Sequence, residues 1–125
     1  MALAKKPVTG MRDITPAEMQ IREYVMNQIK ETYKSFGFTQ IETPCVEHIG
    51  NLTSKQGGDN EKLIFKILKR GDKLNLEEAK EEDDLVDSGL RYDLTLPLSR
   101  YYANNAANLP SPFKALQMGS VWRAD

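Results

Sequence analysis

Side chains able to bind a charged substrate gather in the stretch from Ser88 to Arg100, with the sequence Ser-Gly-Leu-Arg-Tyr-Asp-Leu-Thr-Leu-Pro-Leu-Ser-Arg. Apolar and polar residues alternate over positions 90–93, a pattern that predicts a short strand with one apolar face. Pro97 favours the first turn of a following helix, and Thr95 is its predicted N-cap. Asp93 would then lie at the strand–helix junction, where its carboxylate and the Thr95 hydroxyl could together bind an ammonium group. Helix capping by the same two residues is the commoner explanation of such a pattern, and both interpretations stay open from the local residues alone.

Length and composition are those of one ordinary globular domain. The chain has 125 residues, of which 40% are apolar and 28% charged. Its single cysteine, Cys45, excludes an internal disulfide framework and suits a reducing compartment. The N-terminal residues contain no apolar run long enough for a signal peptide or a membrane span. We therefore expect a cytoplasmic protein that does not bind membranes.

The net charge of −1 conceals a strongly acidic segment. Positions 77–87 carry seven acids and one base, which leaves the rest of the chain with a net charge of +5. We interpret the segment at about 76–88 as a solvated and mobile insertion. The mildly basic remainder suits an anionic ligand, but its Lys and Arg residues are not clustered as a nucleic-acid-binding surface requires.

The clearest element is a helix predicted from Pro16 to Phe36. Thr15 is the expected N-cap, Pro16 suits the first helical position, and Glu18 would complete a capping box. Apolar residues recur at helical spacing along this segment, and Gly37 supplies a C-terminal stop.

Shorter elements are predicted along the rest of the chain. They are a strand over Phe38–Thr43 ended by Pro44, a short helix over Asn51–Gln56, a strand over Leu63–Leu68, a turn at Arg70–Asp72, a return strand over Lys73–Leu76 and a long strand over Phe113–Arg123.

Two further features are poor candidates for a site. His48 is the only histidine, and no cysteine or pair of carboxylates is spaced to help it, so we expect no metal site. The loop at Gln56–Asn60 has two glycines, but it lacks a lysine and a capped helix after it, so we do not expect a phosphate-binding loop.

Four stretches of the chain together resemble the histidyl-tRNA synthetases, which are class II aminoacyl-tRNA synthetases. The matching stretches are Thr9–Asp13 before the proline-started helix, which resembles their N-terminus; Phe36–Pro44 with Glu47, which resembles motif 1; Leu90–Arg100, which resembles the segment that binds the substrate amine; and Met118–Asp125, which resembles the opening of motif 2. The resemblance covers nearly the whole chain except the acidic insertion, and it keeps the family's order.

The resemblance implies an α+β fold with the class II six-stranded antiparallel sheet flanked by helices, present here only in part. Asp93 and Thr95, with the backbone of Leu94, would bind the α-ammonium of histidine. Arg123 would bind the α-phosphate of ATP and act in catalysis, because it would stabilise charge while the histidine carboxylate attacks that phosphorus and pyrophosphate leaves. The histidyl group would then pass to the 3′ end of tRNA(His), and Mg²⁺ bound with ATP would share the phosphate charge. Asp125 stands where the family more often has glutamate, so its nucleotide role is carried over only weakly.

The resemblance also implies that residues 1–125 form the N-terminal portion of a longer catalytic domain, from motif 1 to the start of motif 2. The rest of motif 2, motif 3, the tyrosine-pair histidine motif and the anticodon-binding domain would follow, so we expect this chain alone to be catalytically inactive. The family is homodimeric, with the motif 1 proline, here Pro44, near the interface.

A second family with this fold is an alternative: the regulatory subunit of ATP phosphoribosyltransferase, which senses histidine without charging tRNA. Asp93 and Thr95 do not separate the two families, because both can carry this segment. Tyr92, the Leu96-Pro97 pair and the Arg123-x-acid ending favour the synthetase.

Overall fold

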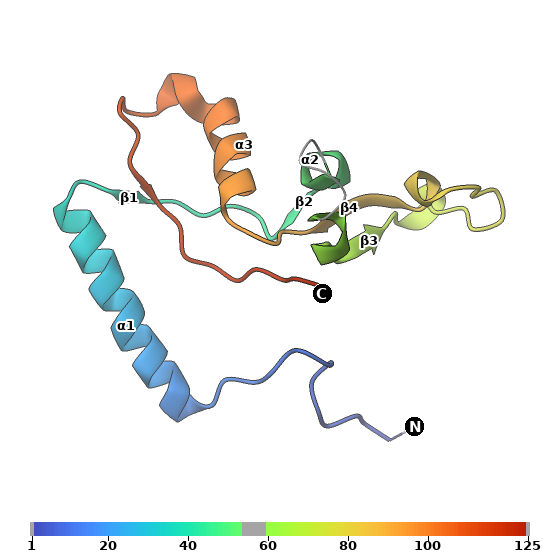
Figure 1. The fold of residues 1–125 in the computed structure, drawn as a ribbon, viewed down its shortest axis with the longest axis horizontal. Coiled ribbons are helices and arrows are strands. Elements are labelled where there is room, and N and C mark those ends of the chain that lie inside the picture. The colour runs from blue at the N-terminus through green and yellow to red at the C-terminus, as the bar shows by residue number, and fades with distance from the viewer. Residues whose placement is uncertain (1, 54–59, 125) are drawn as a thin grey trace. The chain divides into compact units, whose positions relative to one another are not determined.

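The computed structural model describes residues 2–53 and 60–124, which divide into two compact units. The first unit is Met1–Thr39 and the second is Gln40–Asp125. Helix α1 (Pro16–Ser35) belongs to the first unit, and helices α2 (Ile49–Thr53) and α3 (Thr95–Asn105) belong to the second (Figure 1). Within the described ranges, no helix combines the length and the apolar character needed to span a membrane.

Helix α1 begins where the sequence predicts. Thr15 is the N-cap, and its hydroxyl accepts a hydrogen bond from the N–H of Glu18 at 3.5 Å. Pro16 takes the first helical position, where its missing N–H costs nothing. The predicted capping box is only half formed, because the Glu18 carboxylate accepts from Arg12 at 2.8 Å instead. No residue of α1 is buried, so its apolar face is exposed.

The C-terminal end of α1 is a Schellman motif. Gly37 has a φ of 83°, in the left-handed region that glycine adopts without strain. Its N–H donates to the Lys34 carbonyl at 3.0 Å, and the N–H of Phe38 donates to the Tyr33 carbonyl at 3.1 Å. The rings of Tyr33 and Phe38 pack edge to face with centroids 4.9 Å apart, which adds the apolar contact that often accompanies this motif. The predicted glycine stop is confirmed.

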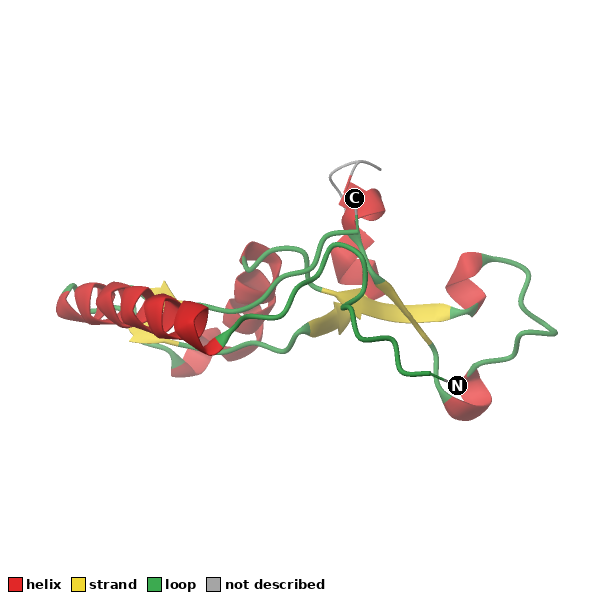
Figure 2. Cartoon of the chain, turned by 90° about the horizontal axis from the view of Figure 1, so that it is seen from below, coloured by secondary structure: helices red, strands yellow, loops and turns green. Residues whose placement is uncertain are grey.

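Five short strands in the described residues form two separate sheets, drawn in yellow in Figure 2. Their bounds are β1 (Thr39–Gln40), β2 (Val46–His48), β3 (Lys66–Leu68), β4 (Val86–Leu90) and β5 (Ala115–Leu116). Strand β1 pairs with β5, whereas β4 lies between β2 and β3 and is antiparallel to both. The α+β class with antiparallel sheet is thus confirmed, and the part of the class II sheet in the described residues consists of five strands in two sheets.

Side chains of the core of the second unit pack directly against Gly89 of β4. Leu52, Ile64 and Val86 are its buried apolar side chains, with exposed fractions of 2%, 6% and 8%. A Cβ on Gly89 would lie 2.8 Å from Cγ2 of Ile64 and 3.0 Å from Cδ1 of Leu52. Because these distances are too short for carbon atoms in contact, a glycine at this position lets both side chains pack directly onto the strand.

Several predicted strands are shorter in the structure. The strand expected over 38–43 is reduced to β1, although the N–H of Ile41 still donates to the Leu116 carbonyl at 2.9 Å. The strand expected over 63–68 is reduced to β3, and a 3₁₀ helix (Asn60–Leu63) precedes it. Strand β2 was not predicted, because three residues after a proline are too few to show alternation.

The predicted return strand over 73–76 is wrong. The side-chain oxygen of Asn75 accepts from the N–H groups of Glu77 and Glu78 at 3.1 and 3.2 Å. An asparagine that bonds to the backbone two and three residues ahead favours a turn over a ladder. The short helix predicted over 51–56 corresponds to α2, which begins two residues earlier, at Ile49. Positions 54–56 of that prediction lie outside the described residues, as does most of the Gln56–Asn60 loop.

The acidic segment has its seven acids exposed, as predicted, but it is attached to the neighbouring strand. Glu82 forms an ion pair with Lys66 of β3. The segment also ends earlier than the predicted boundary of 76–88, because Val86 already pairs with Leu68 as the first residue of β4.

One acid organises the local backbone of this segment. The Oδ2 atom of Asp84 accepts from the N–H groups of Lys80 and Glu81 at 3.0 and 3.2 Å. These two hydrogen bonds stabilise the charged form, and they lower the pKa of the Asp84 carboxyl below its ordinary value.

Candidate functional site

The site that the sequence predicts lies where β4 leads into α3. Helix α3 starts at Thr95, and Leu94 is the residue just before it, with φ −107° and ψ −4°. Pro97 is fully buried in the first turn, in agreement with the prediction. The strand predicted over 90–93 is wrong, because β4 ends at Leu90 and residues 91–94 are not in a strand. Asp93 and Leu94 still lie between β4 and α3, and Thr95 is the first residue of the helix.

Asp93 caps this helix, and the predicted capping role of Thr95 is wrong. The Oδ1 atom of Asp93 accepts a hydrogen bond from the N–H of Leu96 at 3.2 Å. Thr95 is itself the first helical residue, because Leu94 already has helical backbone angles. The capping side chain is therefore that of Asp93, two residues before the predicted Thr95, because it can reach the unpaired N–H of Leu96.

Capping engages one of the two carboxylate oxygens of Asp93. Among the described residues, no hydrogen bond or ion pair reaches its other oxygen, and the side chain is half-buried. The side chain of Thr95, two residues on, is exposed. A half-buried carboxylate with an oxygen left over can accept hydrogen bonds from a cation while it caps the helix. The capping and ammonium-binding interpretations are therefore compatible in one geometry.

Arg123 lies against the same segment, although it is thirty residues further along the chain. Its Nε donates to the Tyr92 carbonyl at 3.1 Å, and the N–H of Trp122 donates to the Arg91 carbonyl at 3.0 Å. The Arg123 side chain is exposed, so its guanidinium remains open to a ligand. Asp125, whose nucleotide role the resemblance carried over weakly, lies outside the described residues.

The long strand predicted over 113–123 is wrong in its length, because only β5 has a neighbouring strand. Beyond it the chain runs extended towards the C-terminus (red in Figure 1) and bonds to non-strand residues instead. One such bond joins the N–H of Ala124 to the Leu63 carbonyl at 2.8 Å. Alternating apolar residues suit any extended backbone with one covered face, so the pattern alone does not require a ladder.

Arg91 is a buried cation that sequence reasoning missed, with an exposed fraction of 5%. Its Nε donates to the Ser120 carbonyl at 2.9 Å, and its NH1 donates to the carbonyl and the hydroxyl of Thr43 at 2.9 and 3.1 Å. A third acceptor of NH1 is the Pro44 carbonyl at 3.5 Å. One guanidinium thus ties Thr43 and Pro44 to the chain that leads to Arg123. No local signal marked its burial, because Arg91 alternates with apolar residues as an exposed polar residue would.

Gly119 leaves the space that this guanidinium occupies. A Cβ at Gly119 would lie 2.5 Å from NH2 of Arg91. The Arg91 side chain cannot move away easily, because its Nε and NH1 are held by the hydrogen bonds described above. A glycine at position 119 is therefore required by this close approach.

Gln117 is a second residue that the sequence did not single out. Its Nε2 donates to the Leu94 carbonyl at 2.9 Å, and its Oε1 accepts from the Thr43 hydroxyl at 2.8 Å. Thr43 is buried, with an exposed fraction of 4%. The amide of Gln117 therefore links the predicted amine-binding segment to the same threonine that Arg91 holds.

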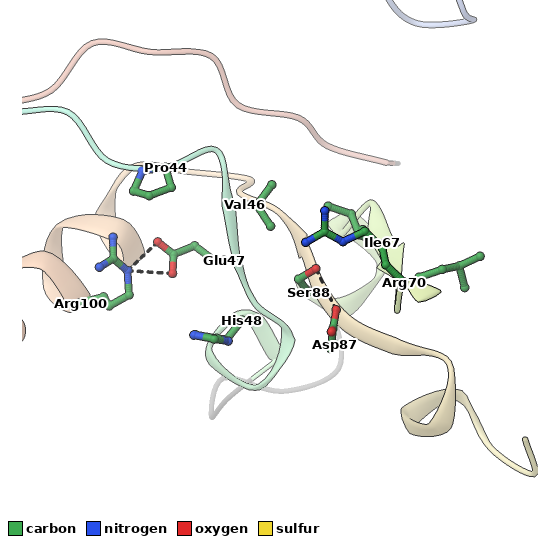
Figure 3. A pocket seen from close by; sticks show the side chains of 10 residues that line it. Pro44, Val46, Glu47, His48, Ile67, Arg70, Asp87, Ser88 and Arg100 are labelled. Carbon is green, nitrogen blue, oxygen red and sulfur yellow. Dashed lines mark hydrogen bonds and ion pairs between the residues drawn. The ribbon is translucent and has the colours of Figure 1, made fainter. Parts of the chain in front are cut away.

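An ion pair on the other side of α3 fixes that helix to strand β2. Both carboxylate oxygens of Glu47 accept from Nε of Arg100, at 2.7 and 2.9 Å, and the Glu47 side chain is 2% exposed (Figure 3). The two residues line a pocket of about 620 Å³ with His48 and Arg70. None of the four predicted site residues lines this pocket, so the pair positions α3 rather than contacting the predicted ligand.

Comparisons with known proteins agree in pointing to one family. A family model described as histidyl-tRNA synthetase matches residues 10–125. A curated relative, the histidine–tRNA ligase of Leifsonia xyli, is 45% identical over the whole of this chain and 30% of its own length. The crystal structure of a histidyl-tRNA synthetase from Nostoc superposes with a TM-score of 0.77 at 28% identity, covering 98% of this chain and 26% of that one.

A further solved structure shares the fold. It is described as an ATP phosphoribosyltransferase regulatory subunit/histidyl-tRNA synthetase from Bacillus halodurans, with a TM-score of 0.74 at 22% identity over 99% of this chain and 29% of that one. The chain spans about 30% of the length of the curated relatives it matches.

Proposed function

The chain belongs to the histidyl-tRNA synthetase family, and from this premise we propose that the complete protein is a histidine–tRNA ligase. It would activate histidine with ATP to histidyl-adenylate and then transfer the histidyl group to the 3′ end of tRNA(His). The observation that carries this proposal is the 3.1 Å hydrogen bond from Arg123 to the Tyr92 carbonyl, because it joins the motif 2 arginine to the segment that contains Asp93.

Histidine would bind through its α-ammonium at the start of α3. The oxygen of Asp93 that does not cap the helix is the proposed acceptor, with help from the Thr95 hydroxyl and the backbone of Leu94. A carboxylate paired with an ammonium in a half-buried position forms a charge-assisted hydrogen bond, which is stronger than a neutral one. The half-burial of Asp93 supports this assignment, since partial exclusion of water strengthens the pairing.

Arg123 would act on the nucleotide. As the histidine carboxylate attacks the α-phosphorus and pyrophosphate leaves, negative charge grows on the phosphoryl oxygens, and a guanidinium can donate two hydrogen bonds to them. The Nε bond to Tyr92 leaves the two terminal nitrogens of Arg123 for this purpose. We therefore propose Arg123 as both an ATP-binding and a catalytic residue.

Magnesium would accompany ATP and supply charge neutralisation at the phosphates. Within the described ranges, no group of three or more His, Cys, Asp or Glu could hold a metal ion. We derive no step through the ion from this chain.

The partners of the complete protein follow from the same proposal. They are histidine, ATP and tRNA(His) as substrates, and a second copy of the chain as the partner in a homodimer. The free Cys45, which is exposed, is consistent with the proposed cytoplasmic location.

Histidine-dependent exchange of pyrophosphate with ATP, measured on the complete protein, tests the proposal. We expect exchange with histidine and none with other amino acids, and no exchange by the 125-residue chain, which spans about 30% of its curated relatives. Exchange by the short chain would contradict its expected inactivity. Binding of histidine by the complete protein without any exchange would favour the histidine-sensing regulatory subunit instead.

A further inference from the structure

Residues 91–94, which carry the proposed amine-binding segment, are held at three carbonyl groups by the chain after β5. The Arg91 carbonyl accepts from the N–H of Trp122 at 3.0 Å, and the Tyr92 carbonyl accepts from Nε of Arg123 at 3.1 Å. The Leu94 carbonyl accepts from Nε2 of Gln117 at 2.9 Å. Two of the donors, Arg123 and Gln117, bond to the residues on either side of Asp93. Gln117 is the one of these two that lies before the stretch resembling motif 2.

The Gln117 amide has a defined orientation because each of its ends has a different partner. The Thr43 hydroxyl can donate to only one acceptor, and it donates to Oε1 at 2.8 Å, which leaves Nε2 as the end that faces Leu94. Thr43 in turn accepts from NH1 of the buried Arg91 at 3.1 Å. An arginine can only donate, so the chain of hydrogen bonds runs in one direction from Arg91 through Thr43 and Gln117 to Leu94.

The Leu94 carbonyl has one other donor, the N–H of Leu98 at 3.2 Å, which is an ordinary first bond of the helix. The carbonyl belongs to the peptide group that joins Leu94 to Thr95. If the Gln117 bond is lost, only the Leu98 bond holds this carbonyl, and the peptide group can tilt. A tilt moves Thr95 directly and Asp93 through the Leu94 Cα, so both side chains change direction. The helix itself would persist, since the Leu98 bond and the Asp93 cap remain.

We propose that Gln117 is a positioning residue for the amino-acid site: through the Leu94 carbonyl it fixes Asp93 and Thr95 for the α-ammonium of histidine, and Arg91 and Thr43 orient it. This inference rests on the proposed function. Gln117 does not touch the substrate, so its contribution is to the affinity for histidine and not to the chemistry at the α-phosphate.

Replacing Gln117 by Met in the complete protein tests the inference, because Met fills a similar volume and cannot donate to the carbonyl. The expected result is a histidine KM raised roughly fivefold to tenfold, the effect of one lost hydrogen bond, with the KM for ATP and kcat changed less than twofold. Gln40→Met is the matched control, since Gln40 is an exposed glutamine of β1, and it should leave all three values unchanged.

Gln117→Glu gives a second and stricter test. The side chain keeps its shape and can still accept from Thr43, but it presents a charged oxygen to the Leu94 carbonyl, so it should raise the histidine KM at least as much as Met does. Thr43→Val should act in the same direction, and its effect should not add to that of Gln117→Met, because both changes break the same chain of bonds.

An unchanged histidine KM in Gln117→Met or Gln117→Glu overturns the inference. The inference is also overturned if both KM values rise and kcat falls by similar factors while the melting temperature falls, because that result describes a purely structural residue. Calorimetric titration of the wild-type protein with histidine separates the two levels of proposal. If the wild type binds no histidine, the proposed function fails and this inference with it; if the wild type binds and the variants bind equally well, only the inference fails.

Discussion

The two roles of Asp93 can be separated by one substitution, Asp93→Asn. Asparagine is as good a helix cap as aspartate, so the bond to the N–H of Leu96 should persist and stability should change by less than about 0.5 kcal/mol. The charge, however, is lost. A hydrogen bond to a charged partner contributes about 1.5–3 kcal/mol, so the affinity for histidine should fall roughly 10- to 150-fold.

Asp93→Ala removes the cap as well as the charge. It should weaken histidine binding by more than tenfold and also lower stability by about 1 kcal/mol, the usual cost of a lost N-cap. For a cooperative unit of 150–250 residues this corresponds to a melting temperature lower by roughly 2–4 °C. The alanine variant alone could not distinguish capping from binding, whereas the pair of variants can.

Calorimetric titration with histidine and thermal melting of the complete protein measure the two effects separately. Asp87→Asn is the matched control, because Asp87 is an exposed acid of β4, the strand that leads into the site, and it should change neither quantity. If Asp93→Asn binds histidine within threefold of the wild type, Asp93 is a helix cap and nothing more. If Asp93→Asn melts as low as Asp93→Ala, the assumption that asparagine preserves the cap is wrong.

Three further substitutions in the complete protein have expected outcomes. Arg123→Ala should lower the rate of pyrophosphate exchange roughly 100-fold or more while histidine affinity changes little, because the charge it would stabilise develops only during adenylate formation; equal losses in both would indicate misfolding. Glu47→Gln should lower the free energy of unfolding in urea by about 3 kcal/mol, since Arg100 loses a buried charged partner; a change below about 0.5 kcal/mol would contradict this. Gly119→Ala should lower the free energy of unfolding by about 1–3 kcal/mol, because its Cβ would displace the guanidinium of Arg91; an unchanged urea midpoint would show that the guanidinium moves freely.

Both ends of helix α1 were predicted correctly from neighbouring residues in the sequence. Helix α1 begins at the predicted proline and ends at the predicted glycine, because caps and stops depend on side chains within a few positions of the helix end. The order of the motifs likewise depends only on the chain itself, and it identified the family that the comparisons support.

Features that need a partner strand were predicted less well. Residues 113–123 alternate as a strand does, yet only Ala115–Leu116 is one, because a ladder needs an adjacent strand and alternation reports only a covered face. The return strand at 73–76 failed for a local reason, since the side chain of Asn75 competes for backbone donors and that competition was overlooked.

The sequence by itself therefore determined the family, the main helix and the positions of Asp93, Thr95 and Arg123 along the chain. Tertiary structure alone decided what surrounds them. Arg91 reaches Thr43 across 48 positions, and Arg100 reaches Glu47 across 53. Buried polar groups must find hydrogen-bond partners wherever the fold provides them, and the identity of those partners depends on geometry that no local pattern encodes.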